Sequence, residues 1–138
     1  MGNQALGKWA EQQAVHCVIE AGFIVLKQNY HSRYGEIDLI AQDGQELIFI
    51  EVKARSKTEY GHANEVVSVA KQRKMVKTAL CFLNDHAEFN DFYCRFDVIC
   101  FDFYQEIAKN VQHHFSSLPY HRDWIINAFV LDDDVASF

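Results

Sequence analysis

The sequence contains few of the residues that interrupt a domain or join one domain to another. Pro119 is the only proline among 138 residues, and there are six glycines. No linker-like run, internal repeat or low-complexity segment is present. Hydrophobic residues make up 49% of the chain, which is enough for a folded core. We therefore expect a single domain over residues 1–131, followed by an acidic C-terminal tail over residues 132–138.

Cysteine pairs and long apolar segments are also lacking. The four cysteines form no C-x-x-C motif, so a zinc ribbon or a thioredoxin-type site is not supported, and buried free thiols are the preferred interpretation. The sequence has no N-terminal apolar segment of the signal-peptide kind and no apolar run of transmembrane length. These features predict a cytoplasmic protein that does not act in a membrane.

Positive charge is scarce. Lysine and arginine number 13 against 19 acidic residues, which gives a formal net charge of -6. Proteins that hold nucleic acid mainly by surface charge are usually basic. A nucleic-acid site in this chain would therefore require a local basic patch, or positive charge supplied by metal ions.

Hydrophobic periodicity predicts a mixed α/β fold. A helical stripe of apolar residues covers 4–20 and ends at Gly22, a natural C-terminal cap. A second helix is expected over 69–84, with Ser68 as its N-cap. Strands are expected over 23–29, 36–42, 46–54, 93–101 and 124–131, and residues 105–115 as a short helix or a loop. The order α-β-β-β-α-β, with one further strand, indicates a mixed β-sheet flanked by helices.

Charged residues alternate with apolar ones along the two middle strands. Because side chains of a strand point to alternate faces, Glu36 and Asp38 should share one face, with Ile37 and Leu39 on the other. Asp43-Gly44 is a strong signal for a tight turn to the next strand. That turn would bring these acids beside the following strand in antiparallel pairing.

The second of these strands carries an acid and a lysine at the same spacing. Glu51 and Lys53 should share a face of the strand, because they are two residues apart. Carboxylates gathered on one face repel each other, and a divalent cation relieves that repulsion. Asp38 and Glu51 are the natural ligands for Mg²⁺ or Mn²⁺, which prefer oxygen. Lys53 could then contact a phosphate or the attacking water, so the pattern predicts a metal-dependent phosphodiesterase site.

An acid followed on the next strand by acid-x-Lys resembles the signature of the PD-(D/E)XK nuclease superfamily. The fuller pattern is similar to the YraN family of predicted endonucleases, and the matching stretches are Gly7 to Ala14, Gly35 to Ile40, Phe49 to Arg55, Arg95 to Val98 and Asn127 to Phe129. Ile37 stands where the superfamily motif has proline, a form that the YraN resemblance already implies. The resemblance implies a restriction-endonuclease-like core and adds Glu11 as an acid that holds a metal-bound water. From the sequence alone, Glu11 could equally be a surface glutamate.

The remaining charged residues leave alternatives open. Glu36 could be a metal ligand at the rim of the site, or could pair with Arg33 or Arg55. Arg55, Lys71 and Lys74 are the expected nucleic-acid contacts, because they form local positive charge near the acids. For Lys77, a solvated helix face is the preferred interpretation. Asp97 is expected to have a structural role, such as a salt bridge with Arg95.

The sequence thus favours an endonuclease that hydrolyses phosphodiester bonds in structured or branched DNA, with Mg²⁺ or Mn²⁺ as cofactor. Two alternatives remain open. One is a catalytically silent nucleic-acid-binding module with a nuclease fold, and the other is an adaptor that acts only with a protein partner. A homodimer would suit an enzyme that cuts two strands symmetrically.

Overall fold

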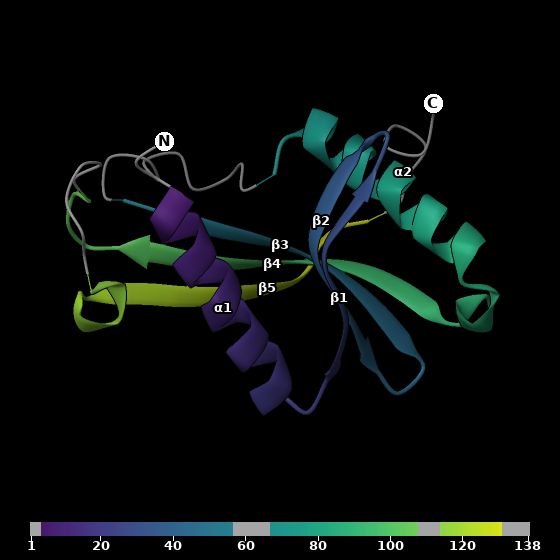
Figure 1. The fold of residues 1–138 in the computed structure, drawn as a ribbon, viewed down its shortest axis with the longest axis horizontal. Helices are drawn as coiled ribbons and strands as arrows, with labels where there is room; N and C mark the ends of the chain where they lie inside the picture. The colour runs from purple at the N-terminus through teal and green to yellow at the C-terminus, as the bar shows by residue number, and fades with distance from the viewer. Residues whose placement is uncertain (1–3, 57–66, 108–113, 131–138) are drawn as a thin grey trace.

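The structure is a computed structural model that describes residues 4–56, 67–107 and 114–130. It has a five-stranded sheet in the order β1-β2-β3-β4-β5, in which β3 and β4 are parallel and the other neighbours antiparallel. The elements are α1 (Gln4–Glu20), β1 (Ile24–Ser32), β2 (Gly35–Asp43), β3 (Glu46–Arg55), α2 (Val69–Asp85), η1 (Ala87–Phe89), β4 (Tyr93–Phe103), η2 (Phe115–Ser117) and β5 (Tyr120–Phe129). This arrangement confirms the predicted mixed α/β fold and its element order (Figure 1).

The two long helices cover opposite faces of the sheet. Four residues of α1, each four positions apart, are fully buried against one face: Leu6, Ala10, Ala14 and Val18. On α2, the buried residues Met75, Val76, Ala79 and Phe82 pack against the other face. Side chains of β3 point alternately to the two faces of the sheet. Ile48 and Ile50 pack in the core under α1, and Leu47 and Phe49 pack in the core under α2. The central strands are therefore apolar on both faces over most of their length.

Both helix boundaries predicted from capping residues are confirmed. Gly22 has a φ of 90°, which an L side chain rarely adopts. Its N–H donates to the carbonyl of Ile19 (2.9 Å), and the N–H of Phe23 donates to the carbonyl of Val18 (3.1 Å), which closes α1 as a Schellman motif. At the start of α2, the Ser68 hydroxyl accepts a hydrogen bond from the Lys71 N–H at 3.2 Å.

Strict alternation fails at Asp38. Ile37 packs into the core on the α2 side, whereas Leu39 packs into the core on the α1 side, so the expectation that they share a face was wrong. Asn29, which lies between the β1 partners of these two residues, has a φ of 51°. The strand pair is kinked at this point, and the kink reverses the side toward which Ile37 points. The alternation of side chains along a regular strand does not predict such a kink.

Other differences concern the ends of elements. β5 begins at Tyr120, four residues before the predicted start, because residues 120–125 continue the ladder along β4. Residues 104–107 are irregular and η2 is a single 3-10 turn. Residues 108–113, position 131 and the acidic tail predicted over 132–138 lie outside the described residues. In the described part of the chain, no helix is both long and apolar enough to cross a membrane.

The cysteines are free thiols, as predicted, but only one is fully buried. Cys100 is 1% exposed, Cys17 and Cys81 are half-buried, and Cys94 is exposed. Burial raises the pKa of the Cys100 thiol to about 11, so this side chain stays protonated and behaves as a small apolar group.

Candidate metal and phosphodiester site

Asp38 and Glu51, which we call the acidic pair, lie where β2 separates from β3. The last registered pair of the two strands is Leu39 with Ile50. Past this pair, the Val52 N–H of β3 donates a hydrogen bond to an Asp38 carboxylate oxygen at 2.8 Å, and not to a backbone carbonyl of β2. The side chain therefore caps the free edge of β3 and holds the carboxylate against Glu51 at the fork.

The acidic pair is almost wholly buried. Asp38 is 9% exposed and Glu51 is 8% exposed. Burial raises the pKa of Asp38 to about 7, and the neighbouring Glu51 charge adds to the rise, whereas the Val52 N–H and Lys71 oppose it. Two buried carboxylates in contact are unfavourable unless a proton or a cation lies between them. The predicted meeting of these two acids is thus present in the fold.

Lys71 reaches the acidic pair from α2. Its Nζ lies 3.6 Å from a Glu51 carboxylate oxygen, and its side chain is one-third exposed. The sequence predicts that Lys71 contacts phosphate, whereas the structure places its ammonium group at the Glu51 carboxylate. A lysine at this point supplies positive charge to the pair while keeping one side toward solvent.

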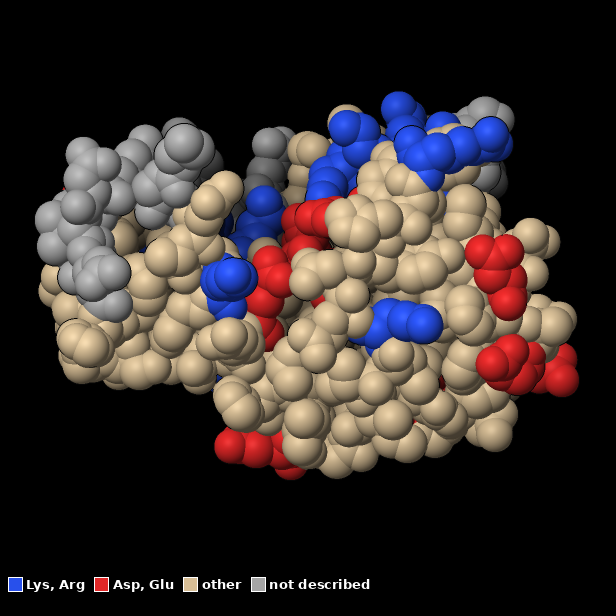
Figure 2. Space-filling view, viewed as in Figure 1, with Lys and Arg blue, Asp and Glu red and all other residues tan. Residues whose placement is uncertain are grey.

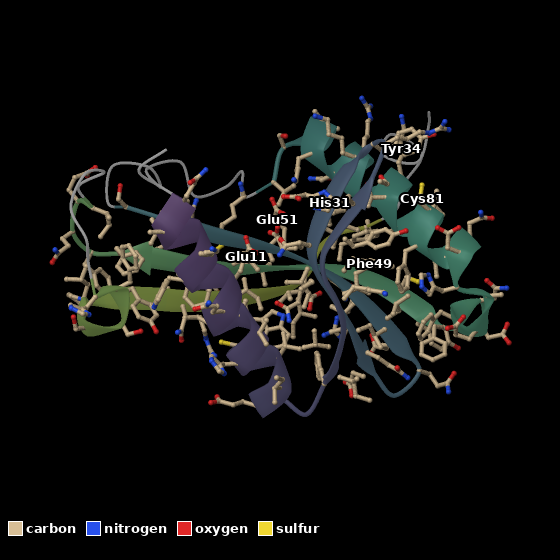
Figure 3. All side chains as sticks on the ribbon, in the orientation of Figure 1. Glu11, His31, Tyr34, Phe49, Glu51 and Cys81 are labelled. Atoms are coloured by element: carbon tan, nitrogen blue, oxygen red, sulfur yellow. The ribbon has the colours of Figure 1, made fainter. Side chains whose placement is uncertain are left out.

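Glu11 approaches the same acids from α1. Its pKa is raised, mainly by burial and then by the charges of Asp38 and Glu36, while a hydrogen bond from the Asn29 side chain lowers it. Glu11 and Asn29 line an open hollow of about 720 Å³. In Figure 3, Glu11 points from α1 toward the region where Glu51 lies. The effect of the Asp38 charge on the pKa of Glu11 supports the interpretation that Glu11 belongs to the site.

Figure 2 shows acidic side chains in a hollow at the centre of one face, with basic side chains above it over the start of α2. Lys53 is half-buried and lines a depression of about 410 Å³ at the end of β3. Within residues 4–56, 67–107 and 114–130 it forms no ion pair. Its ammonium group is therefore available to an anion that enters this depression.

The other three candidate residues differ in how accessible they are. Arg55 is held by two hydrogen bonds to Asp102, at 2.8 and 3.0 Å, and its side chain is 16% exposed. Glu36 lies at the rim, where its partner is His31 at 3.3 Å and not the expected Arg33 or Arg55. Lys74 is exposed on α2. Of these residues, Lys74 is the most open to a phosphate group.

Asp97 is a buried acid outside the site. It is completely buried and accepts hydrogen bonds from Arg95 at 3.1 and 3.2 Å, from the Trp124 indole at 2.9 Å and from the Asn127 N–H at 3.0 Å. The expected salt bridge with Arg95 is confirmed. These donors satisfy the carboxylate without a cation, and they tie β4 to β5.

Residues 10–101 match an uncharacterised protein family, UPF0102. A UPF0102 protein of Acinetobacter baumannii is 55% identical over 129 residues, which cover 94% of this chain and 97% of that protein. The chain belongs to the UPF0102 family. A UPF0102 protein of Acinetobacter baylyi is 56% identical over 91% of the chain and 90% of its own length. A more distant UPF0102 protein, from Clostridium botulinum, is 41% identical over 70% of the chain and 79% of its own length.

The stretch that matches the UPF0102 family contains the acidic pair, Lys53, Lys71 and Glu11. Among the described residues, no group of three acidic, histidine or cysteine side chains is close enough to hold a metal ion. The acidic pair therefore offers two carboxylate ligands. That number suits Mg²⁺ or Mn²⁺, which usually take one or two carboxylates and complete their shell with water and phosphate oxygens. The donor set of this UPF0102 chain fits such an ion.

Asn29 and the ion pair between Lys71 and Glu51 are the two features of the site that the sequence did not predict. Asparagine adopts positive φ more readily than most residues, so Asn29, the last residue of the predicted strand, was the available signal for the kink. The ion pair between Lys71 and Glu51 left no sequence signal, because the two residues meet only through the packing of α2 on the sheet.

Proposed function

We propose that this UPF0102 protein is an endonuclease that depends on Mg²⁺ or Mn²⁺ and hydrolyses phosphodiester bonds in structured or branched DNA. The observation that carries the proposal is the buried acidic pair at the fork of β2 and β3, with Lys71 of α2 paired to Glu51. The resemblance to the YraN family and to PD-(D/E)XK nucleases supports the same activity. The free cysteines fit a cytoplasmic location, where such a substrate is available.

Each residue has a distinct task in the proposed reaction. Asp38 and Glu51 would hold the divalent ion, which lowers the pKa of a bound water and offsets charge on the phosphate. Lys53 faces the open depression and would orient the scissile phosphate and the attacking water. Glu11 would accept a hydrogen bond from a water on the α1 side. A homodimer would allow two strands to be cut, one by each subunit.

The test is cleavage of a panel of end-labelled single-stranded, duplex, nicked and four-way-junction DNAs, with Mg²⁺ and with Mn²⁺. We expect cleavage of at least one structured substrate, and its loss in Asp38→Ala and Lys53→Ala. Asp123→Ala is the matched control, because Asp123 is an exposed acid on β5. If every substrate stays intact, or if Asp38→Ala cuts as well as the natural protein, the proposal is wrong.

A further inference from the structure

The turn between β1 and β2 is fixed to α2 instead of projecting freely. The Ser32 hydroxyl lies 2.8 Å from the hydroxyl of Thr78, a fully buried residue of α2, and it also accepts the Tyr34 N–H at 3.1 Å. A Cβ built on Gly35 would lie 3.5 Å from the Cβ of Lys74. The backbone of this turn therefore has a set position beside the lysines of α2.

Two cations are held on one aromatic side chain in this turn. Arg33 donates a hydrogen bond to the Tyr34 hydroxyl at 2.7 Å, and its guanidinium carbon lies 4.9 Å from the centre of the ring. Lys77 of α2 places its Nζ 5.3 Å from the same centre. The Tyr34 ring thus brings an arginine from the turn and a lysine from the helix together. An aromatic side chain used in this way organises positive charge and does not serve as a stacking platform for a base.

Lys71, Lys74 and Lys77, which we call the lysine row, connect this turn to the acidic pair. They are three residues apart, and they span about 9 Å along the helix axis at ~1.5 Å per residue. One end of the row contacts Glu51, the middle lies beside Gly35 and the other end contacts the Tyr34 ring. Figure 2 shows this basic surface above the acidic hollow, in a protein whose net charge is -6.

We propose that Lys74, Lys77 and Arg33, organised by Tyr34, form a binding track for the phosphates of a DNA strand whose scissile bond lies at the acidic pair. Successive phosphates of a duplex strand advance about 3.4 Å along its axis, so ~9 Å corresponds to two or three nucleotides beyond the cleaved bond. Such contacts position a strand without reading its sequence. This inference rests on the proposed function, and it adds a requirement for nucleotides on one side of the cut.

The test is the affinity for a DNA junction, measured by fluorescence anisotropy in EDTA between 50 and 300 mM salt. Each phosphate contact lowers log K by about 0.9 per unit of log salt. We therefore expect Lys77→Gln and Arg33→Gln each to reduce the slope by about 1 and to weaken binding about eightfold at 0.1 M salt. Tyr34→Leu keeps both charges, so it should weaken binding with an unchanged slope.

Arg122→Gln is the control, because Arg122 lies on β5 at the opposite edge of the sheet and should leave the slope unchanged. Equal slopes in the natural protein and Lys77→Gln would overturn the track, as would the absence of salt-dependent DNA binding in the natural protein. If Lys77→Gln and Arg33→Gln weaken the binding of polyglutamate more than the binding of DNA, the surface binds an acidic protein partner. That result would also overturn the DNA track. Since binding is measured in EDTA, a lack of cleavage would refute the proposed function and leave this test intact.

Discussion

Replacing Asp38 by asparagine should stabilise the fold while removing its proposed activity. Asparagine keeps a side-chain oxygen that can accept the Val52 N–H, so the cap on β3 is retained. The substitution removes a buried negative charge from beside Glu51. The expected gain in stability comes from the removal of that charge and not from a new contact.

The size of the effect follows from the pKa of Asp38, which is raised from an ordinary 3.8 to about 7 by burial and by the Glu51 charge. The folded state therefore binds a proton more tightly than the unfolded state. The stabilisation that the fold gains from protonated Asp38 is fully present below pH ~4. It falls as the pH rises toward 7, and above pH 7 it does not change further. At 1.36 kcal/mol per pKa unit, the cost of ionised Asp38 at pH 8 is up to about 4 kcal/mol.

The assay is urea unfolding of the natural protein and Asp38→Asn in EDTA, at several values between pH 4 and 8. The variant should have nearly the same free energy of unfolding at pH 4 and a larger one, by up to about 4 kcal/mol, at pH 8. Asp97→Asn is the matched control, because the Asp97 carboxylate is also buried but accepts hydrogen bonds from Arg95, Trp124 and Asn127. That variant should lose about 3 kcal/mol. If Asp38→Asn is destabilised at pH 8, or if the two variants behave alike, the ionised acidic pair does not destabilise the fold.

Three further perturbations test single contacts. Lys71→Gln removes the cation that lowers the pKa of Asp38, so NMR titration of the Asp38 carboxyl should give a higher pKa than in the natural protein, and an unchanged value would contradict the contact. Ser68→Ala removes the N-cap of α2 and should cost ~1 kcal/mol in urea unfolding, whereas no loss would mean that the cap is dispensable. Phe82→Ala empties a fully buried position on α2 and should cost ~3–5 kcal/mol by the same measurement, with the exposed Leu80→Ala as the control.

The sequence was sufficient for the parts of the fold that depend on local chemistry. The capped helices are an example, since Ser68 and Gly22 act through hydrogen bonds to residues a few positions away. The acidic pair could also be predicted, because a tight turn at Gly44 fixes how β2 and β3 pair.

Features that depend on the packing of distant elements could not be predicted in this way. The kink at Asn29 reverses the side of Ile37, although the strand pattern is regular in sequence. Lys71 meets Glu51 only because α2 docks across the sheet. The contact of Lys77 with the Tyr34 ring likewise joins a turn to a helix more than 40 positions away in the chain.

The most direct test of the central claim is calorimetric titration of Mn²⁺ into the natural protein, Asp38→Asn, Glu51→Gln and Asp97→Asn. We expect one divalent-ion site in the natural protein that is lost in Asp38→Asn and in Glu51→Gln. Asp97→Asn should retain the site, because Asp97 has its own donors away from the fork. Binding of Mn²⁺ that is unchanged in Asp38→Asn, or no binding by the natural protein, would contradict the assignment of Asp38 and Glu51 as a metal site.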